Sequence, residues 1–140
     1  TVPEKKLEIR RVELRRMAFE AAPVPHLDAA KIDWENVDLR INCNVNRLKK
    51  NYALIMTANV HAKSGDDTAF WITVEEVGMF AAQGYAEEEV ENLLRTKGAA
   101  QLYPFVREVI LSTVARCGLP NLGLTPFPFD VPKLESSATD

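Results

Sequence analysis

The chain of 140 residues is long enough for one domain with a buried core and too short for two. Its composition, 46% hydrophobic and 26% charged, is that of an ordinary globular domain, and a formal charge of −3 argues against a globally basic nucleic-acid binder. The two cysteines, Cys43 and Cys117, form no disulfide pattern and favour a reducing, cytoplasmic setting. The polar residues 1–6 give no signal-peptide pattern, and no apolar run is long enough to predict membrane insertion.

Residues 7–19 predict a long, irregular first strand. Apolar side chains stand at positions 7 and 9, 12 and 14, and 17 and 19, and each jump of three shifts the apolar face by one residue. An extended strand absorbs such a shift with a bulge. The basic residues crowded along this strand are interpreted as a solvated face, because no aromatic residues for base stacking are interleaved with them. Residues 21–36 have little periodicity and predict a long crossover loop, a kind of segment that is often functional.

Three more strands are expected after this loop. Residues 37–46 and 52–62 alternate apolar and polar side chains, the pattern of half-buried strands. Residues 64–67 are a strong hairpin signal, and residues 68–80 predict a fourth strand. One face of that strand carries Phe70, Ile72 and Val74, and the other carries Trp71, Thr73 and Glu75. The three strands predict an antiparallel meander to which the first strand is added.

The spacing of apolar residues becomes helical after Gly84. A short helix is expected to end at Gly98 in a left-handed cap, and a second helix to begin near Leu102, with Pro104 in its first turn. The apolar stripe of this second helix is wider than one sheet face requires, so the helix is either deeply covered or shared with another subunit. We favour a subunit interface, formed by Phe105, Val109 and Leu111.

Residues 119–129 combine prolines and glycines with large apolar side chains. This composition predicts an extended segment that lies over an apolar surface or beside a groove. Residues 1–130 are expected to form a single domain, and residues 131–140 a polar, frayed tail.

Short strings from about Leu7 to Asp130 resemble those of the SecB export-chaperone family, in the same order and with nearly the same spacing. The most specific is L-Y-P-F-V-R-E at residues 102–108, which is similar to the family's L-F/Y-P-Y/F-x-R-E helix start. Residues 116–122 and 124–130 are similar to R-x-G-F-P-x-L and L-x-P-I/V-N-F-D. The other strings are Phe19-Glu20-Ala21 with Pro25-His26, Thr68-Ala69-Phe70 and Gly78-Met79-Phe80.

This resemblance implies an α+β fold, a four-stranded antiparallel sheet with helices packed on one face, assembled as a homotetramer that is a dimer of dimers. It also implies an ATP-independent holding chaperone that binds unfolded client or precursor proteins in hydrophobic grooves and passes them to the motor SecA. No cofactor, metal or catalytic activity is implied. Apolar, aromatic and methionine side chains suit such a binder, because its affinity comes from buried area and must adapt to many sequences. The groove candidates are Val24, Leu27, Trp34, Met79, Phe80, Leu119, Leu122, Phe127 and Phe129, of which Phe80 and Leu119 fit the core equally well.

The surface that contacts SecA in the family is altered in this sequence. Arg16 stands where typical members have an acidic residue, whereas Glu20 keeps one, and Trp71 and Thr73 replace a leucine and a glutamate. The loss of two carboxylates and the gain of an arginine predict weak or absent SecA binding. The proline-broken, polar residues 131–140 are also not expected to form the C-terminal helix of typical members. A SecB-like chaperone dedicated to one client, such as the antitoxin of a toxin–antitoxin system, is therefore an alternative.

An enzyme and a non-chaperone oligomeric scaffold are the other classes considered. His26 and His61 are the only histidines, and no catalytic triad, metal-ligand spacing or phosphate-binding loop can be recognised. Cys43 occupies an apolar strand position and is interpreted as a core residue rather than a nucleophile. A scaffold uses the same residue types as a chaperone, and an aggregation-suppression assay separates the two.

Overall fold

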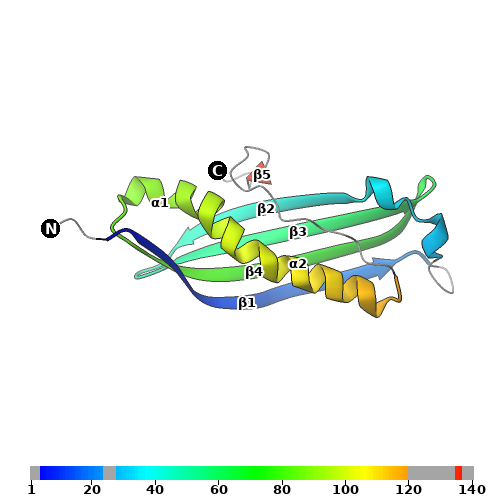
Figure 1. The fold of residues 1–140 in the computed structure, drawn as a ribbon, viewed down its shortest axis with the longest axis horizontal. Coiled ribbons are helices and arrows are strands. Elements are labelled where there is room, and N and C mark those ends of the chain that lie inside the picture. The colour runs from blue at the N-terminus through cyan, green and yellow to red at the C-terminus, as the bar shows by residue number, and fades with distance from the viewer. Residues whose placement is uncertain (1–3, 24–27, 120–134, 137–140) are drawn as a thin grey trace.

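A computed structural model describes residues 4–23, 28–119 and 135–136. Its sheet is long and narrow, and a single helical rod crosses one of its faces (Figure 1). The four antiparallel strands are β1 (Lys6–Ala21), β2 (Asp38–Arg47), β3 (Tyr52–Ser64) and β4 (Asp67–Gln83). They lie in the order β1-β4-β3-β2, and the two-residue β5 (Glu135–Ser136) pairs in parallel with β2. The predicted fold class is confirmed, whereas the predicted tail contributes this short strand.

Strand β1 contains two irregularities, each at a place where the apolar spacing jumps. Its register with β4 shifts between Ile9 and Arg11 and again between Leu14 and Arg16. Each shift restores the apolar side chains to the face that carries the helix, because the side chains of a strand alternate between its two faces. We call this the helix-bearing face and the opposite one the open face.

The connections between strands follow the turn signals of the sequence. Gly65, with a φ of 64°, lies in the turn between β3 and β4, a conformation that glycine adopts without strain. The crossover from β1 to β2 was predicted to be a loop without regular structure, but it contains two 3-10 turns, η1 (Ala29–Lys31) and η2 (Trp34–Asn36). The side chain of Asp28 caps the first turn by accepting a hydrogen bond from the Ala30 amide at 3.1 Å.

The helical region differs from the prediction, because its two helices are continuous. Helix α1 (Glu87–Leu93) passes through a π-helical turn, η3 (Leu94–Gly98), into helix α2 (Ala99–Arg116). Gly98 has a helical φ of −63° and is not a left-handed cap. A Cβ atom there would lie 3.2 Å from a Leu94 methyl group and 3.6 Å from one of Leu54, so the glycine permits close packing on the sheet. Pro104 lies inside α2 rather than in its first turn.

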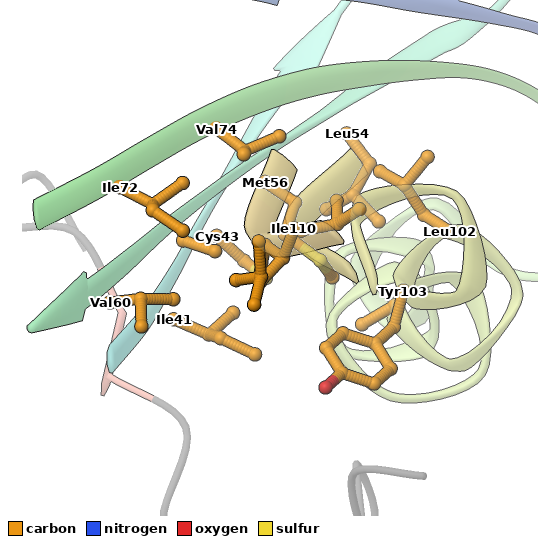
Figure 2. Packing of buried hydrophobic residues seen from close by; sticks show 14 of the residues in the cluster. Ile41, Cys43, Leu54, Met56, Val60, Ile72, Val74, Leu102, Tyr103 and Ile110 are labelled. Carbon is orange, nitrogen blue, oxygen red and sulfur yellow. The ribbon is translucent and has the colours of Figure 1, made fainter. Parts of the chain in front are cut away.

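The core fills the space between α2 and the helix-bearing face (Figure 2). Leu54, Met56 and Val74 project from the sheet towards Leu102 and Ile110 of α2, and all five side chains are buried. None of the described helices is long and apolar enough to cross a membrane. Within the described ranges, no group of histidine, cysteine and acidic side chains is placed to hold a metal ion.

Candidate functional site

Large apolar side chains are exposed on β1 and on α2. Leu14 is 52% exposed, and Met17 and Phe105 are each 46% exposed. Strand register pairs Leu14 with Glu76 and Met17 with Val74, which places both β1 side chains on the helix-bearing face. The helix therefore leaves part of this face uncovered, although water-exposed apolar surface of this kind is unfavourable in a monomer.

A cavity of about 360 Å³ lies along this exposed surface. Residues of α2 and one residue of β4 form its walls, namely Glu76, Pro104, Phe105, Glu108 and Val109. We call the cavity, together with Leu14 and Met17, the α2–β1 valley. The cavity lining combines the apolar side chains of Pro104, Phe105 and Val109 with the carboxyl groups of Glu76 and Glu108, so it can accept both apolar side chains and a positive charge.

The predicted groove residues are only partly brought together. Trp34 is half-buried; its ring centre lies 6.3 Å from that of Phe70, and its Nε1 atom donates a hydrogen bond to the carbonyl oxygen of Ala29 at 2.9 Å. Leu119 is buried in the same core cluster. Met79 is half-buried and pairs with Ala53 on the open face, so it lies across the sheet from Trp34. The remaining candidates that fall outside the described residues are Val24, Leu27, Leu122, Phe127 and Phe129.

Phe80 requires a correction. Its side chain is fully buried and belongs to the core cluster, so it does not form a wall of an open groove. The alternation of β4 accounts for this position, because Phe80 shares the helix-bearing face with Phe70, Ile72 and Val74.

The predicted partner surface is assembled on the open face. Glu20 is opposite Trp71, Ala18 is opposite Thr73, and Arg16 is opposite Glu75 in the pairing of β1 with β4. A depression of about 200 Å³ is lined by Ala18, Glu20, Trp71 and Thr73. The ring of Trp71 stacks on His61 at 3.8 Å, and the Thr73 hydroxyl donates a hydrogen bond to Asn59 at 3.0 Å. These contacts hold the Trp71 ring and the Thr73 hydroxyl in fixed positions on the surface.

The three predicted interface residues of α2 lie on two flanks of the helix. Phe105 and Val109 line the α2–β1 valley. Leu111, which is half-buried, lies in a second depression of about 380 Å³ that is lined by Pro104, Arg107, Glu108, Leu111 and Ser112. The structure thus separates residues that the helical stripe had grouped together.

Leu14, Met17, Glu76 and Glu108 were not among the predicted site residues. A signal for Glu76 was present, because the alternation of Phe70, Ile72 and Val74 continues to this residue and places a charge on the apolar face. No comparable signal marked Leu14 and Met17, since their exposure depends on the path of α2 over the sheet.

Comparison with known proteins assigns the class of this fold. The family model described as preprotein translocase subunit SecB matches residues 2–132. The protein-export protein SecB of Nitrosococcus oceani is 32% identical over 124 residues, covering 87% of this chain and 76% of that protein. Those of Halorhodospira halophila and Legionella pneumophila are 31% and 30% identical, covering 93% and 91% of this chain and 75% and 78% of their own.

A solved structure has the same fold. The Mycobacterium tuberculosis SecB-like chaperone Rv1957, in complex with a ChAD peptide from the HigA1 antitoxin, superposes with a TM-score of 0.72 at 19% identity, covering 86% of this chain and 90% of that one. The architecture is therefore that of the SecB-like chaperones. The chain belongs to the SecB family.

Proposed function

We propose that the chain is an ATP-independent holding chaperone that binds unfolded polypeptides on exposed apolar surface and catalyses no reaction. The observation that carries the proposal is the α2–β1 valley, where Leu14, Met17 and Phe105 are each about half exposed. An unfolded client buries its own apolar side chains there, at roughly 25 cal/mol per Å² of apolar surface removed from water. Membership of the SecB family supports the same function.

Aggregation suppression tests this proposal directly. The double variant Leu14→Ser/Met17→Ser removes two apolar contacts from the valley, and we expect it to lose most of its ability to keep a denatured model protein soluble at stoichiometric amounts. Leu48→Ser is the matched control, because Leu48 is 43% exposed but lies in the turn between β2 and β3. If the double variant still protects the model protein fully, the valley is not the client-binding surface. If the wild type gives no protection, the chain is a scaffold and not a chaperone.

The subunits associate, in this proposal, through the flank of α2 that carries Leu111. Its depression of about 380 Å³ adjoins the valley and shares Pro104 and Glu108 with it, whereas Phe105 and Val109 line the valley alone and are proposed to contact clients. A homotetramer built as a dimer of dimers agrees with the family resemblance, and mass measurement in solution tests it. We place the protein in the cytoplasm, where the free thiols of Cys43 and Cys117 suit reducing conditions.

A chaperone dedicated to one client is the second candidate. The SecB-like chaperone of similar fold is bound to a peptide of an antitoxin, and the altered open face of this chain favours a role away from general export. A pull-down from the native cytosol distinguishes the candidates, because a dedicated chaperone retains one protein and a general one retains many. The half-buried candidates Trp34 and Met79, on opposite faces of the sheet, and those at 24, 27, 122, 127 and 129 remain proposed client contacts in both, whereas Leu119 belongs to the buried core.

A further inference from the structure

The outer edge of β2 is a regular strand edge that the proposed function does not use. β2 pairs with β3 in one register without a shift, and the two-residue β5 lies beyond it, whereas β1 at the opposite edge contains two register shifts. A regular edge presents a row of backbone N–H and C=O groups with which another extended chain can pair. In a chaperone that holds unfolded polypeptide, such an edge is a hazard, because clients and further copies of the chain can add to it as strands.

The turn between β2 and β3 determines which residues of β2 face this edge. The Leu48 amide donates a hydrogen bond to the Asn51 carbonyl oxygen at 2.8 Å, so these two residues form a bonded pair. Bonded and non-bonded pairs alternate along an antiparallel ladder, and Cys43 lies an odd number of positions before Leu48. Cys43 and Met56 therefore form a non-bonded pair. The backbone N–H and C=O groups of Cys43 point away from β3, towards the outer edge.

Arg95 covers this point of the edge from the helical rod. Its Nη1 atom donates a hydrogen bond to the Cys43 carbonyl oxygen at 2.5 Å, and its Nε atom lies 3.6 Å from the Glu91 carboxylate. The Arg95 side chain is only 19% exposed although it is charged. It belongs to the π-helical turn η3, which contacts β2. A strand that paired with Cys43 would have to compete with this charge-assisted hydrogen bond, which is stronger than a neutral one.

The strand β5 covers the same point from the C-terminal side of the chain. Glu135 pairs with Asn42, and Ser136 pairs with Cys43, in parallel along the outer edge of β2 (Figure 1). Two elements that are distant in sequence therefore meet at Cys43, and each occupies a place that an added strand would need. A parallel pair of two residues is weak by itself, so the edge is better protected by β5 and Arg95 together than by either alone.

We propose that Arg95 and β5 close the outer edge of β2 to extended polypeptide. Clients are then held through their side chains and not through backbone pairing with this edge, and a captured client does not become part of the sheet. This inference rests on the proposed holding function and specifies how a client is bound and kept releasable.

Two labelled, unstructured peptides of one apolar sequence test the closure by fluorescence anisotropy. One peptide has an ordinary backbone, whereas in its twin alternate amides are N-methylated, which removes N–H donors and leaves the side chains unchanged. We expect the wild type to bind both peptides with affinities within about twofold of each other. The double variant Arg95→Met/Glu135→Pro removes the guanidinium and blocks the β5 pairing, since proline has no amide hydrogen. It should bind the ordinary peptide about tenfold more tightly than the twin, the effect of one or two net hydrogen bonds.

Arg116→Met is the matched control, because Arg116 is an exposed arginine in the last turn of α2. It should behave as the wild type, and a preference equal to that of the double variant would overturn the inference. An equally strong preference in the wild type would show that the edge is open, and no preference in the double variant would show that it accepts no strand. Both results overturn the closure and leave the holding function intact, whereas a wild type that binds neither peptide would overturn both proposals.

Hydrogen exchange at the Cys43 amide provides a second measurement that needs no client. The single variant Glu135→Pro leaves the helical rod unaltered, so it decides if the double variant does not fold. We expect the Cys43 amide to exchange clearly faster in Glu135→Pro than in the wild type, because the β5 pairing is lost. An unchanged exchange rate would show that β5 does not cover the edge.

Discussion

Trp71 and Glu76 occupy opposite faces of β4, and each is unusual for the face on which it lies. Trp71 is a large aromatic residue that is 45% exposed on the open face, where His61 stacks against it. Glu76 is an acid enclosed by the apolar side of the same strand. The exposed indole and the buried carboxyl group each cost stability in an isolated subunit, and both positions are explained if binding partners cover them.

The difference in stability between Glu76→Gln and the wild type should depend on pH in a defined direction. Because burial, with a smaller effect of the Glu108 carboxylate, raises the pKa of Glu76 in the folded chain, the folded state binds more protons than the unfolded state above the ordinary value of 4.5. The stability contributed by this group is present below that value and is lost as the pH rises through the raised pKa. We therefore expect Glu76→Gln to exceed the wild type by about 1 kcal/mol in free energy of unfolding at neutral to basic pH.

Urea unfolding at several pH values measures this difference, which should shrink towards acidic pH as Glu76 becomes protonated. Glu88→Gln, at an exposed position in the first turn of α1, is the control for the removal of one carboxyl group from the chain. An advantage of Glu76→Gln that is the same at every pH would contradict the assignment.

Single side chains on β4 were predictable where alternation alone determines their direction. The sequence correctly placed Trp71 and Thr73 together on one face and Phe70, Ile72 and Val74 on the other. Whether a residue on the helix-bearing face is covered could not be predicted, because α2 crosses β4 and leaves Leu14 exposed while Phe80 is buried. Coverage depends on the path of another element, which periodicity does not contain.

At the scale of elements, two of the three described glycines with positive φ make a matched pair. Gly65 (φ 64°) has open space where a Cβ atom would lie, whereas at Gly84 (φ 79°) that atom would be 2.7 Å from the carbonyl oxygen of Glu4. Gly65→Ala should cost about 1–2 kcal/mol from backbone strain alone. Gly84→Ala should cost clearly more, because the segment before β1 must also move.

Thermal unfolding of the two variants provides the comparison, with the melting temperature of Gly84→Ala expected to be the lower. Equal losses would show that the backbone around Glu4 adapts to the added methyl group without cost.

The strands of this fold were predictable from the sequence, but the junction between the helices was not. Two-residue alternation located β2, β3 and β4, and the jumps in apolar spacing anticipated both irregularities of β1. Gly98 and Pro104 are normally signals for the end and the beginning of a helix, yet here both lie within one helical rod. Gly98 is explained by close packing against Leu94 and Leu54, a tertiary contact that local signals do not report.

At the scale of the molecule, the open face determines which proteins can dock behind the sheet. We propose that the chain binds SecA weakly or not at all, because Arg16 and Thr73 stand where the family resemblance places acidic residues. The double variant Arg16→Asp/Thr73→Glu should strengthen binding to SecA at least tenfold in calorimetry, with Lys63→Glu as a control for net negative charge. Micromolar or tighter affinity of the unaltered chain would contradict the proposal.

The α2–β1 valley and the depression beside Trp71 lie on opposite sides of one sheet, separated by a single layer of backbone. Occupation of one side therefore does not obstruct the other. A subunit that already carries its cargo can still be approached by a second protein at the open face. Loading and transfer therefore do not compete for one surface, and a three-component assembly is sterically permitted.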